Sequence, residues 1–139
     1  ILPKSDINKL KQEEIDYLNT LNIKLLEYNK NPLEIYKNLD IIVQPTNYFE
    51  GLNRVILEAG SLEIPIITYH NRGTNDIIPS EDYGYLISKE TSPLSLAVEI
   101  KKIIEDSDKA KIKSLKLRKH IEKNFDTILV TQKFMDILS

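Results

Sequence analysis

Two glutamates, Glu50 and Glu58, are separated by seven residues around the predicted start of a helix. Glu50 lies on the expected turn between a strand and the helix, and Glu58 lies about two turns into the helix. The first turn of a helix presents unpaired backbone N–H groups, which favour phosphate. At about 1.5 Å per residue, Glu58 lies about 10 Å beyond the helix start, which is near the span from sugar to ribose in a nucleotide-sugar. This spacing fits a ligand held at both ends by a carboxylate and at its diphosphate by amides.

The same spacing also fits a purely structural role for both residues. Glu50 would then cap the helix, and Glu58 would lie on its solvated face. Gly51 follows Glu50 and lets a ligand approach the backbone closely. The spacing alone leaves both interpretations open.

The composition is that of a globular protein. The chain has 139 residues, of which 41% are hydrophobic and 29% are charged, and this predicts one domain with a sizeable core. The net charge of −2 gives no strong attraction for nucleic acid, so we expect no such partner. The absence of cysteine excludes disulfides and thiolate metal sites. No apolar run approaches the roughly 18 residues that span a bilayer. Because the chain begins with Ile1, we expect it to be a fragment of a longer protein.

Short apolar runs alternate with helical patterns over the first two thirds of the chain. Four runs have the length and continuous apolarity of buried parallel strands, at residues 23–26, 41–43, 64–69 and 85–87. A first helix is predicted from a cap at Ser5 or Asp6 to Leu21, and a second begins at Asn31. Two more are predicted over residues 52–61 and from Thr74. This alternation predicts an α/β fold with a Rossmann-like, doubly wound parallel sheet.

The last third of the chain is predicted to be a helical C-terminal tail. Ser92 and Pro93 begin one helix, a lysine-rich helix covers about residues 110–124, and a terminal helix covers about residues 126–138. Acidic residues are interleaved with the lysines, which indicates a solvated helical face. Contact with an anionic membrane surface is the alternative interpretation.

Polar loops follow the predicted strands, where ligands of doubly wound sheets bind. These loops are residues 27–29, 44–47 and 69–73. Arg54 and Arg72 flank the expected phosphate position, and each suits either a bidentate phosphate contact or a surface salt bridge. His70 has two possible interpretations, as a general base or as an ordinary polar residue of the loop. No His and Asp cluster has the spacing of metal ligands, so we expect no bound metal.

Several motifs occur together in this region. Residues 39–46 read Leu-Asp-Ile-Ile-Val-Gln-Pro-Thr, and residues 50–59 read Glu-Gly-Leu-Asn-Arg-Val-Ile-Leu-Glu-Ala. Ile-Pro-Ile-Ile-Thr follows at residues 64–68, and Gly-Tyr-Leu-Ile at residues 84–87. Together these motifs closely resemble the retaining GT-B glycosyltransferases of family 4, over about residues 23–106. The Glu-Gly-Leu-x-Arg-Val form most resembles bacterial enzymes that build surface polysaccharides.

The resemblance implies that the chain is the C-terminal, nucleotide-sugar-binding half of a GT-B fold, as a single domain over residues 1–139. Glu50 and Glu58 would be the catalytic pair, with Glu50 at hydroxyls of the donor sugar and Glu58 at the ribose. The loop at Glu27 and Tyr28 would hold the base. The donor itself is a substrate, and no cofactor is implied.

The other residues expected to bind the donor lie along the helix start and after the next strand. They are Gly51, Leu52, Asn53, Arg54, Val55, Arg72 and Gly73. By the resemblance, the backbone amides around Arg54 and Val55 would meet the phosphates.

The sequence departs from the family pattern at several points. Glu63 occupies a position that usually holds glycine, Gly60 falls where a bulkier residue is common, and Thr46 replaces a serine. The basic residues that neutralise the phosphates in the family, and its N-terminal acceptor domain, would lie upstream and are absent from this chain. We therefore expect this fragment to be inactive on its own.

The function implied is the transfer of a hexose from a nucleotide-diphosphate donor to a glycan or lipid-linked glycan in cell-surface polysaccharide synthesis. The cytoplasm is the expected location, with the inner face of the membrane, through peripheral association, as a narrower alternative. A non-catalytic nucleotide- or sugar-binding module and a sugar-nucleotide epimerase of GT-B fold remain as alternative functions. A glycoside hydrolase fits less well, because its two carboxylates converge across a cleft rather than follow one helix edge.

Overall fold

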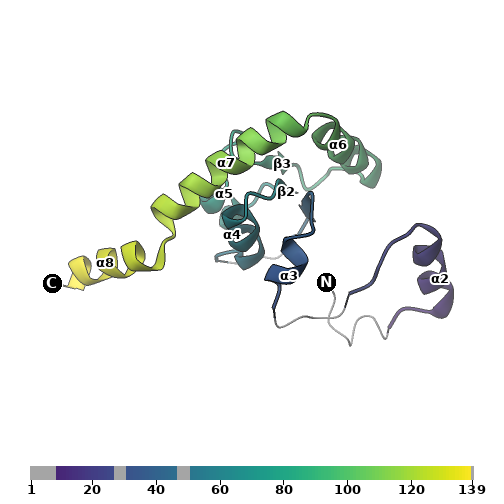
Figure 1. The fold of residues 1–139 in the computed structure, drawn as a ribbon, viewed down its shortest axis with the longest axis horizontal. Helices are drawn as coiled ribbons and strands as arrows, with labels where there is room; N and C mark the ends of the chain where they lie inside the picture. Colours follow the sequence, from purple (N-terminus) through teal and green to yellow (C-terminus); the bar gives the residue numbers. More distant parts are fainter. Residues whose placement is uncertain (1–8, 27–30, 47–50, 139) are drawn as a thin grey trace. The chain divides into compact units, whose positions relative to one another are not determined.

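The computed structural model describes residues 9–26, 31–46 and 51–138 (Figure 1). Two compact units are present, residues 1–35 and residues 36–139. The first contains the helix α2 (Gln12–Thr20) and most of α3 (Leu33–Tyr36), and the second contains the sheet.

The helix α2 begins later than the sequence pattern predicts. Its first turn follows Lys11, whose backbone N–H donates to Glu14 Oε2 at 2.8 Å. The predicted caps, Ser5 and Asp6, lie outside the described residues. The second predicted start is confirmed to within two residues, since α3 begins directly after Pro32.

The predicted strand at residues 23–26 is wrong. These residues have no regular structure, and Ile23 and Leu26 are 43% and 45% exposed. They follow the end of α2, where Asn22 takes a left-handed conformation (φ 55°) and the Ile23 N–H donates to Leu18 O at 3.0 Å. The apolar run therefore follows the C-terminal end of a helix and does not join the sheet. An apolar run by itself does not specify a strand with which it would pair, which is why the sequence pattern was misleading.

The second unit contains a parallel three-stranded sheet in the order β1 (Ile42–Gln44), β2 (Ile66–Tyr69) and β3 (Tyr85–Ile87). The register pairs Val43 with Ile67, and Ile67 with Tyr85. Within the described ranges these are the strands present. β3 has its predicted bounds, β1 is shifted by one residue, and β2 begins two residues later than expected.

The helices α4 (Arg54–Ser61) and α5 (Arg72–Ile77) connect consecutive strands. Each begins at an asparagine whose side-chain oxygen accepts a backbone N–H three residues on: Asn53 Oδ1 from Ile56 at 3.2 Å, and Asn71 Oδ1 from Thr74 at 3.0 Å. The prediction placed the start of α5 at Thr74, but the asparagine cap places it two residues earlier.

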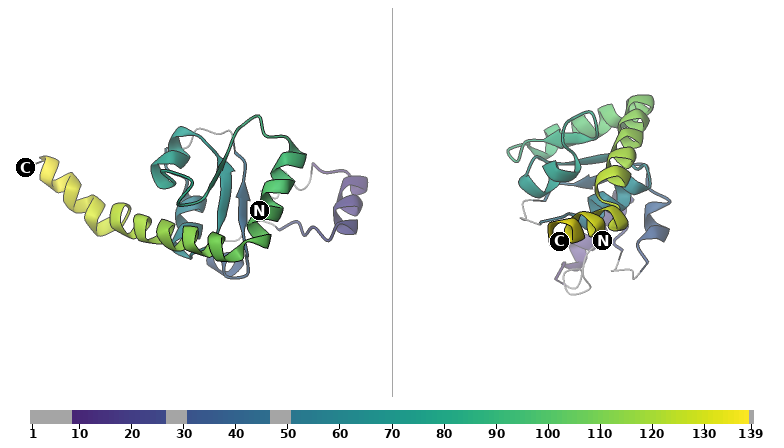
Figure 2. Two further views of the ribbon diagram at one scale, coloured as in Figure 1. Left: turned by 90° about the horizontal axis from the view of Figure 1, so that it is seen from above. Right: turned by 90° about the vertical axis from the view of Figure 1, so that its left-hand side faces the viewer.

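The sheet is covered on both faces, as doubly wound folds require. Successive β2 residues point to opposite faces: Ile66 packs with Ile56 of α4 and Ile77 of α5, whereas Ile67 packs with Ile103 of α6 (Pro93–Glu105). Figure 2 shows α5 and α6 on opposite sides of the strands. The fold is therefore α/β with a doubly wound parallel sheet.

The helical tail follows the predicted order. Asp106 both ends α6 and caps α7 (Ser107–Asn124), through its Oδ1 and the Lys109 N–H at 3.2 Å. α7 begins three residues earlier than predicted, and α8 (Thr127–Leu138) follows it. In the described part of the chain, no helix is long and apolar enough to cross a membrane.

One lysine of α7 fits neither predicted interpretation of the lysine-rich helix. The Nζ of Lys113 donates to the Gly84 carbonyl oxygen at 3.1 Å and lies 4.1 Å from the centroid of the Tyr85 ring. Burial lowers the pKa of Lys113, the nearby charge of Lys109 lowers it further, and the side chain fixes α7 against β3.

The two unusual residues at the end of α4 have structural explanations. The Ile64 N–H donates to Ala59 O and the Glu63 N–H to Gly60 O, both at 3.1 Å, which is a Schellman motif. Glu63 is the left-handed residue of this motif (φ 60°), which is why glycine suits the position. Gly60 faces α7: a Cβ built there would lie 2.5 Å from Ile121 Cδ1 and 2.9 Å from Leu117 Cδ2. The absence of a side chain at Gly60 lets α4 approach α7 closely.

Candidate functional site

The candidate site lies at the carboxyl edge of the sheet, where β1 and β2 end. The Thr68 hydroxyl donates to the Gln44 carbonyl oxygen at 2.9 Å. Beyond the strand ends, Asn71 Nδ2 donates to the Thr46 carbonyl oxygen at 3.4 Å. These two hydrogen bonds join the segments where β1 and β2 end, so the edge is a connected framework rather than two separate loops.

The start of α4 presents the amides that the sequence assigns to phosphate. The Asn53 side chain is buried, with 3% of its surface exposed, and satisfies the Ile56 N–H. For the Arg54 and Val55 N–H groups, no acceptor is found among the described residues. A Cβ built on Gly51 meets nothing within 4 Å. Among the described residues, the first turn of α4 is thus capped at the Ile56 amide and has no acceptor for the amides of Arg54 and Val55; an anion is the ligand that such helix-start amides favour.

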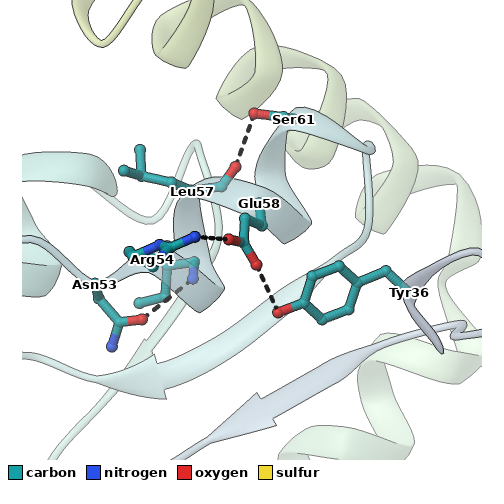
Figure 3. A network of polar contacts seen from close by, with 7 residues as sticks. Tyr36, Asn53, Arg54, Leu57, Glu58 and Ser61 are labelled. Atoms are coloured by element: carbon teal, nitrogen blue, oxygen red, sulfur yellow. Dashed lines mark hydrogen bonds and ion pairs between the residues drawn. The ribbon is translucent and has the colours of Figure 1, made fainter. Parts of the chain in front are cut away.

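Glu58 is held by two other side chains (Figure 3). Its Oε2 accepts a hydrogen bond from the Tyr36 hydroxyl at 3.1 Å, and its Oε1 accepts one from Arg54 Nη2 at 3.1 Å. Arg54 thus uses its guanidinium in a salt bridge with Glu58, one of the two roles that the sequence left open. An ionised carboxylate has about four acceptor positions, so two protein contacts leave room for ligand hydroxyls.

Tyr36 is a neutral hydrogen-bond donor in this site. Burial, together with the hydrogen bond to Glu58 and the charge of that carboxylate, raises the pKa of Tyr36 to about 12. The hydroxyl therefore stays protonated at neutral pH, and a protonated phenol beside a carboxylate can only donate to it.

Arg72, Gly73 and His70 lie after β2. Arg72 begins α5 and is exposed, whereas Gly73 is buried within the helix. His70 is exposed, and its ring nitrogens lie 3.3 and 3.4 Å from Asn75 Nδ2. In residues 31–46 and 51–138, no hydrogen bond or ion pair joins these residues to the Glu58 group.

The remaining predicted site residues can be placed only in part. Leu52 is 47% exposed beside the start of α4, and Val55 is half-buried in its first turn. Glu50 and Tyr28 lie outside the described residues. The separation of the two glutamates and the contact of Tyr28 with a base therefore stay predictions.

Sequence reasoning missed Tyr36 and placed Gln44 in a polar loop without singling it out. Tyr36 lies 22 positions before Glu58, and only the path of the chain through β1 brings the two together. Gln44 ends β1, and its buried Oε1 has no hydrogen-bond partner among the residues that the structure describes; the same holds for Asn75 Oδ1. Gln44 falls in a loop that the sequence identified, so a polar residue at a strand end was the available signal.

A cavity of about 620 Å³ lies at the other end of the sheet. Its walls include Asp40 and Pro65, which precede β1 and β2, together with Ile103 of α6 and Ala110 of α7. Since ligands of doubly wound sheets bind at the carboxyl edge, this cavity is separate from the candidate site.

Two solved structures have the same fold as this chain. Anabaena HepE in complex with UDP-glucose has a TM-score of 0.78 at 20% identity, covering 91% of this chain and 36% of that one. A glycosyltransferase from Rickettsia africae has a TM-score of 0.79 at 22% identity, covering 91% of this chain and 34% of that one. The fold is therefore one half of a GT-B fold with a helical tail.

The chain belongs to the glycosyl transferases group 1 family, which residues 4–125 match. It is 29% identical over 121 residues to the capsular polysaccharide biosynthesis glycosyltransferase CapM of Staphylococcus aureus, covering 85% of this chain and 31% of CapM. It is 27% identical over 103 residues to spore coat protein SA of Bacillus subtilis, covering 74% of this chain and 27% of that protein. The chain thus spans about a third of the length of these relatives.

Proposed function

We propose that this chain is the donor-binding domain of a retaining glycosyltransferase of family 4. The enzyme would transfer a hexose from a nucleotide-diphosphate donor to a glycan or lipid-linked glycan during cell-surface polysaccharide synthesis. The similarity to CapM, a capsular polysaccharide biosynthesis glycosyltransferase, supports a role in polysaccharide synthesis. The donor class is supported by the shared fold with HepE, whose structure contains UDP-glucose.

The observation that carries the proposal is the arrangement at the start of α4. The amides of Arg54 and Val55, which have no acceptor among the described residues, lie one helical turn before a carboxylate that two other side chains hold in place. Amides at a helix start stabilise a diphosphate, and aligned donors of this kind assist its departure. In this proposal Glu58 accepts hydrogen bonds from the ribose and Glu50 contacts the donor sugar.

The proposed reaction involves no cofactor, since basic side chains and amides would neutralise the diphosphate. Transfer would occur in the cytoplasm at the inner face of the membrane, where a lipid-linked acceptor is available. We expect the 139-residue chain to bind the donor without transferring sugar, because the proposed acceptor domain is an additional part of the enzyme. The anomeric configuration of a product of the whole enzyme, measured by NMR, would test retention.

The test is a calorimetric titration of the chain with UDP, GDP and ADP. We expect one of the three to bind, and Glu58→Ala to weaken that binding by about 10- to 100-fold, because hydrogen bonds between a charged group and the ribose are lost. Glu105→Ala is the matched control, since Glu105 is an exposed helical glutamate that pairs with Lys101. A folded chain that binds none of the three, or a Glu58→Ala variant that binds as well as the parent, would overturn the proposal.

A further inference from the structure

The two side chains that hold Glu58 differ greatly in how firmly they are themselves held. The side chain of Arg54 is 85% exposed, and an exposed ion pair within one helix restrains its partner weakly. Tyr36 is 5% exposed and belongs to the core cluster with Ile42, Ile56 and Ile64. The tyrosine hydroxyl is therefore the rigid contact of the carboxylate.

We propose that Tyr36 is a positioning residue that orients the Glu58 carboxylate toward the ribose of the donor. This inference rests on the proposed function, in which Glu58 binds the ribose hydroxyls. Tyr36 itself is not a catalytic residue here, because it acts through Glu58.

The geometry gives Tyr36 a specific effect. Its hydroxyl occupies one acceptor position of Oε2, and the guanidinium of Arg54 occupies one of Oε1. The carboxylate plane is thereby fixed, and the unused lone pairs keep fixed directions. A ligand that meets a carboxylate already in its binding orientation does not have to order it, which is the energetic advantage of preorganisation.

Tyr36→Phe removes this contact with the smallest change in packing, because only the hydroxyl is lost. We expect the variant to stay folded and to bind the preferred nucleoside diphosphate about 10-fold more weakly, because the Glu58 carboxylate is then no longer preorganised for the ribose. Tyr83→Phe is the matched control, because Tyr83 is a half-buried tyrosine that packs against the same core.

A second ligand separates positioning from a general structural role. The 2′,3′-dideoxy form of the same nucleotide lacks the hydroxyls that Glu58 would bind. If Tyr36 acts through Glu58, Tyr36→Phe weakens binding of the ribose form and leaves binding of the dideoxy form unchanged. Glu58→Gln has the same selective effect, and adding Tyr36→Phe to Glu58→Gln causes no further loss.

Each other outcome overturns the inference in a recognisable way. If Tyr36→Phe weakens both forms equally, or weakens neither while Glu58→Gln weakens the ribose form, Tyr36 does not position Glu58, and the proposed function stands. If Glu58→Gln leaves the preference for the ribose form intact, the assumed role of Glu58 fails as well. If the parent chain binds none of UDP, GDP and ADP, the proposed function and the inference fail together.

Discussion

Arg118 Nη1 of α7 donates to Glu63 Oε1 at 2.7 Å, so a salt bridge secures the left-handed residue that ends α4. The same arginine donates through Nε to Glu122 Oε1 at 2.8 Å. These two carboxylates raise the pKa of Arg118, Glu122 foremost. The salt bridge of the Glu63 side chain therefore offsets part of the stability that its left-handed backbone conformation costs.

Replacing Glu63 should separate the two contributions. We expect Glu63→Gly to be more stable than Glu63→Ala by about 1 kcal/mol, because glycine adopts a left-handed conformation without strain and alanine does not. The salt bridge lies at the surface, so a double-mutant cycle with Arg118→Ala should give only a small coupling. Urea unfolding measures both quantities, and an alanine variant at least as stable as the glycine variant would contradict the explanation.

Gly60 should resist even the smallest side chain. Gly→Ala inside a helix usually stabilises a protein by about 1 kcal/mol. Here the added Cβ meets Ile121 and Leu117, which are buried, so we expect Gly60→Ala to destabilise the chain by about 1 to 2 kcal/mol. Ile121→Val removes the nearer methyl group and should restore part of that loss in the double variant.

Gly51→Ala is the control for this experiment, because a Cβ at Gly51 meets nothing within 4 Å. Its thermal midpoint should stay close to that of the parent chain. If Gly60→Ala is as stable as Gly51→Ala, the close approach of α4 and α7 does not depend on glycine.

Gln44→Leu should stabilise the unliganded chain. A buried oxygen without a hydrogen-bond partner costs about 1 to 3 kcal/mol. Leucine has a similar size and removes the Gln44 Oε1, which is buried and has no partner within the described ranges. We expect a rise of about 1 kcal/mol in the free energy of unfolding. Gln44→Glu keeps the shape, adds a charge at the same place and should have the opposite effect. A lower stability for the leucine variant would show that the oxygen has a partner in solution.

Alkaline pH should remove the stability that Tyr36 contributes. Its pKa is about 12 in the folded chain, against 10.0 as its ordinary value, so the unfolded chain releases this proton first as the pH rises. The contribution is complete below pH 10 and is lost toward pH 12, by about 2 to 3 kcal/mol in total. The difference in unfolding free energy between the parent chain and Tyr36→Phe, measured from about pH 8 to 12, should change by this amount. A difference that stays constant over that range would contradict the shift.

The sequence predicts the elements whose signals are local. Ser92 with Pro93 gives the start of α6 to the residue, and the run at residues 85–87 gives β3 with its observed bounds. Asn71 is a cap residue, yet the prediction chose Thr74, because several residue types in that loop can begin a helix. Residues 23–26 had the composition of a strand and lacked a partner, which composition does not encode.

In the candidate site, too, some features follow from local sequence and others depend on contacts between distant residues. The helix start at Arg54 and Val55 follows a strand, and this is visible in the sequence. The role of Tyr36 depends on a contact between distant positions, and no local pattern specifies it. The salt bridge of Arg54 was one of two alternatives, and the choice required the rotamers of both side chains.

The long helix α7 contributes Ala110 to the cluster beneath α6, and Leu117 and Ile121 to the cluster beneath α4. One continuous helix thus packs against both hydrophobic clusters, so we expect the two clusters to unfold together. Spectroscopic reporters placed on the two sides of the sheet should consequently lose their native signals at one common temperature.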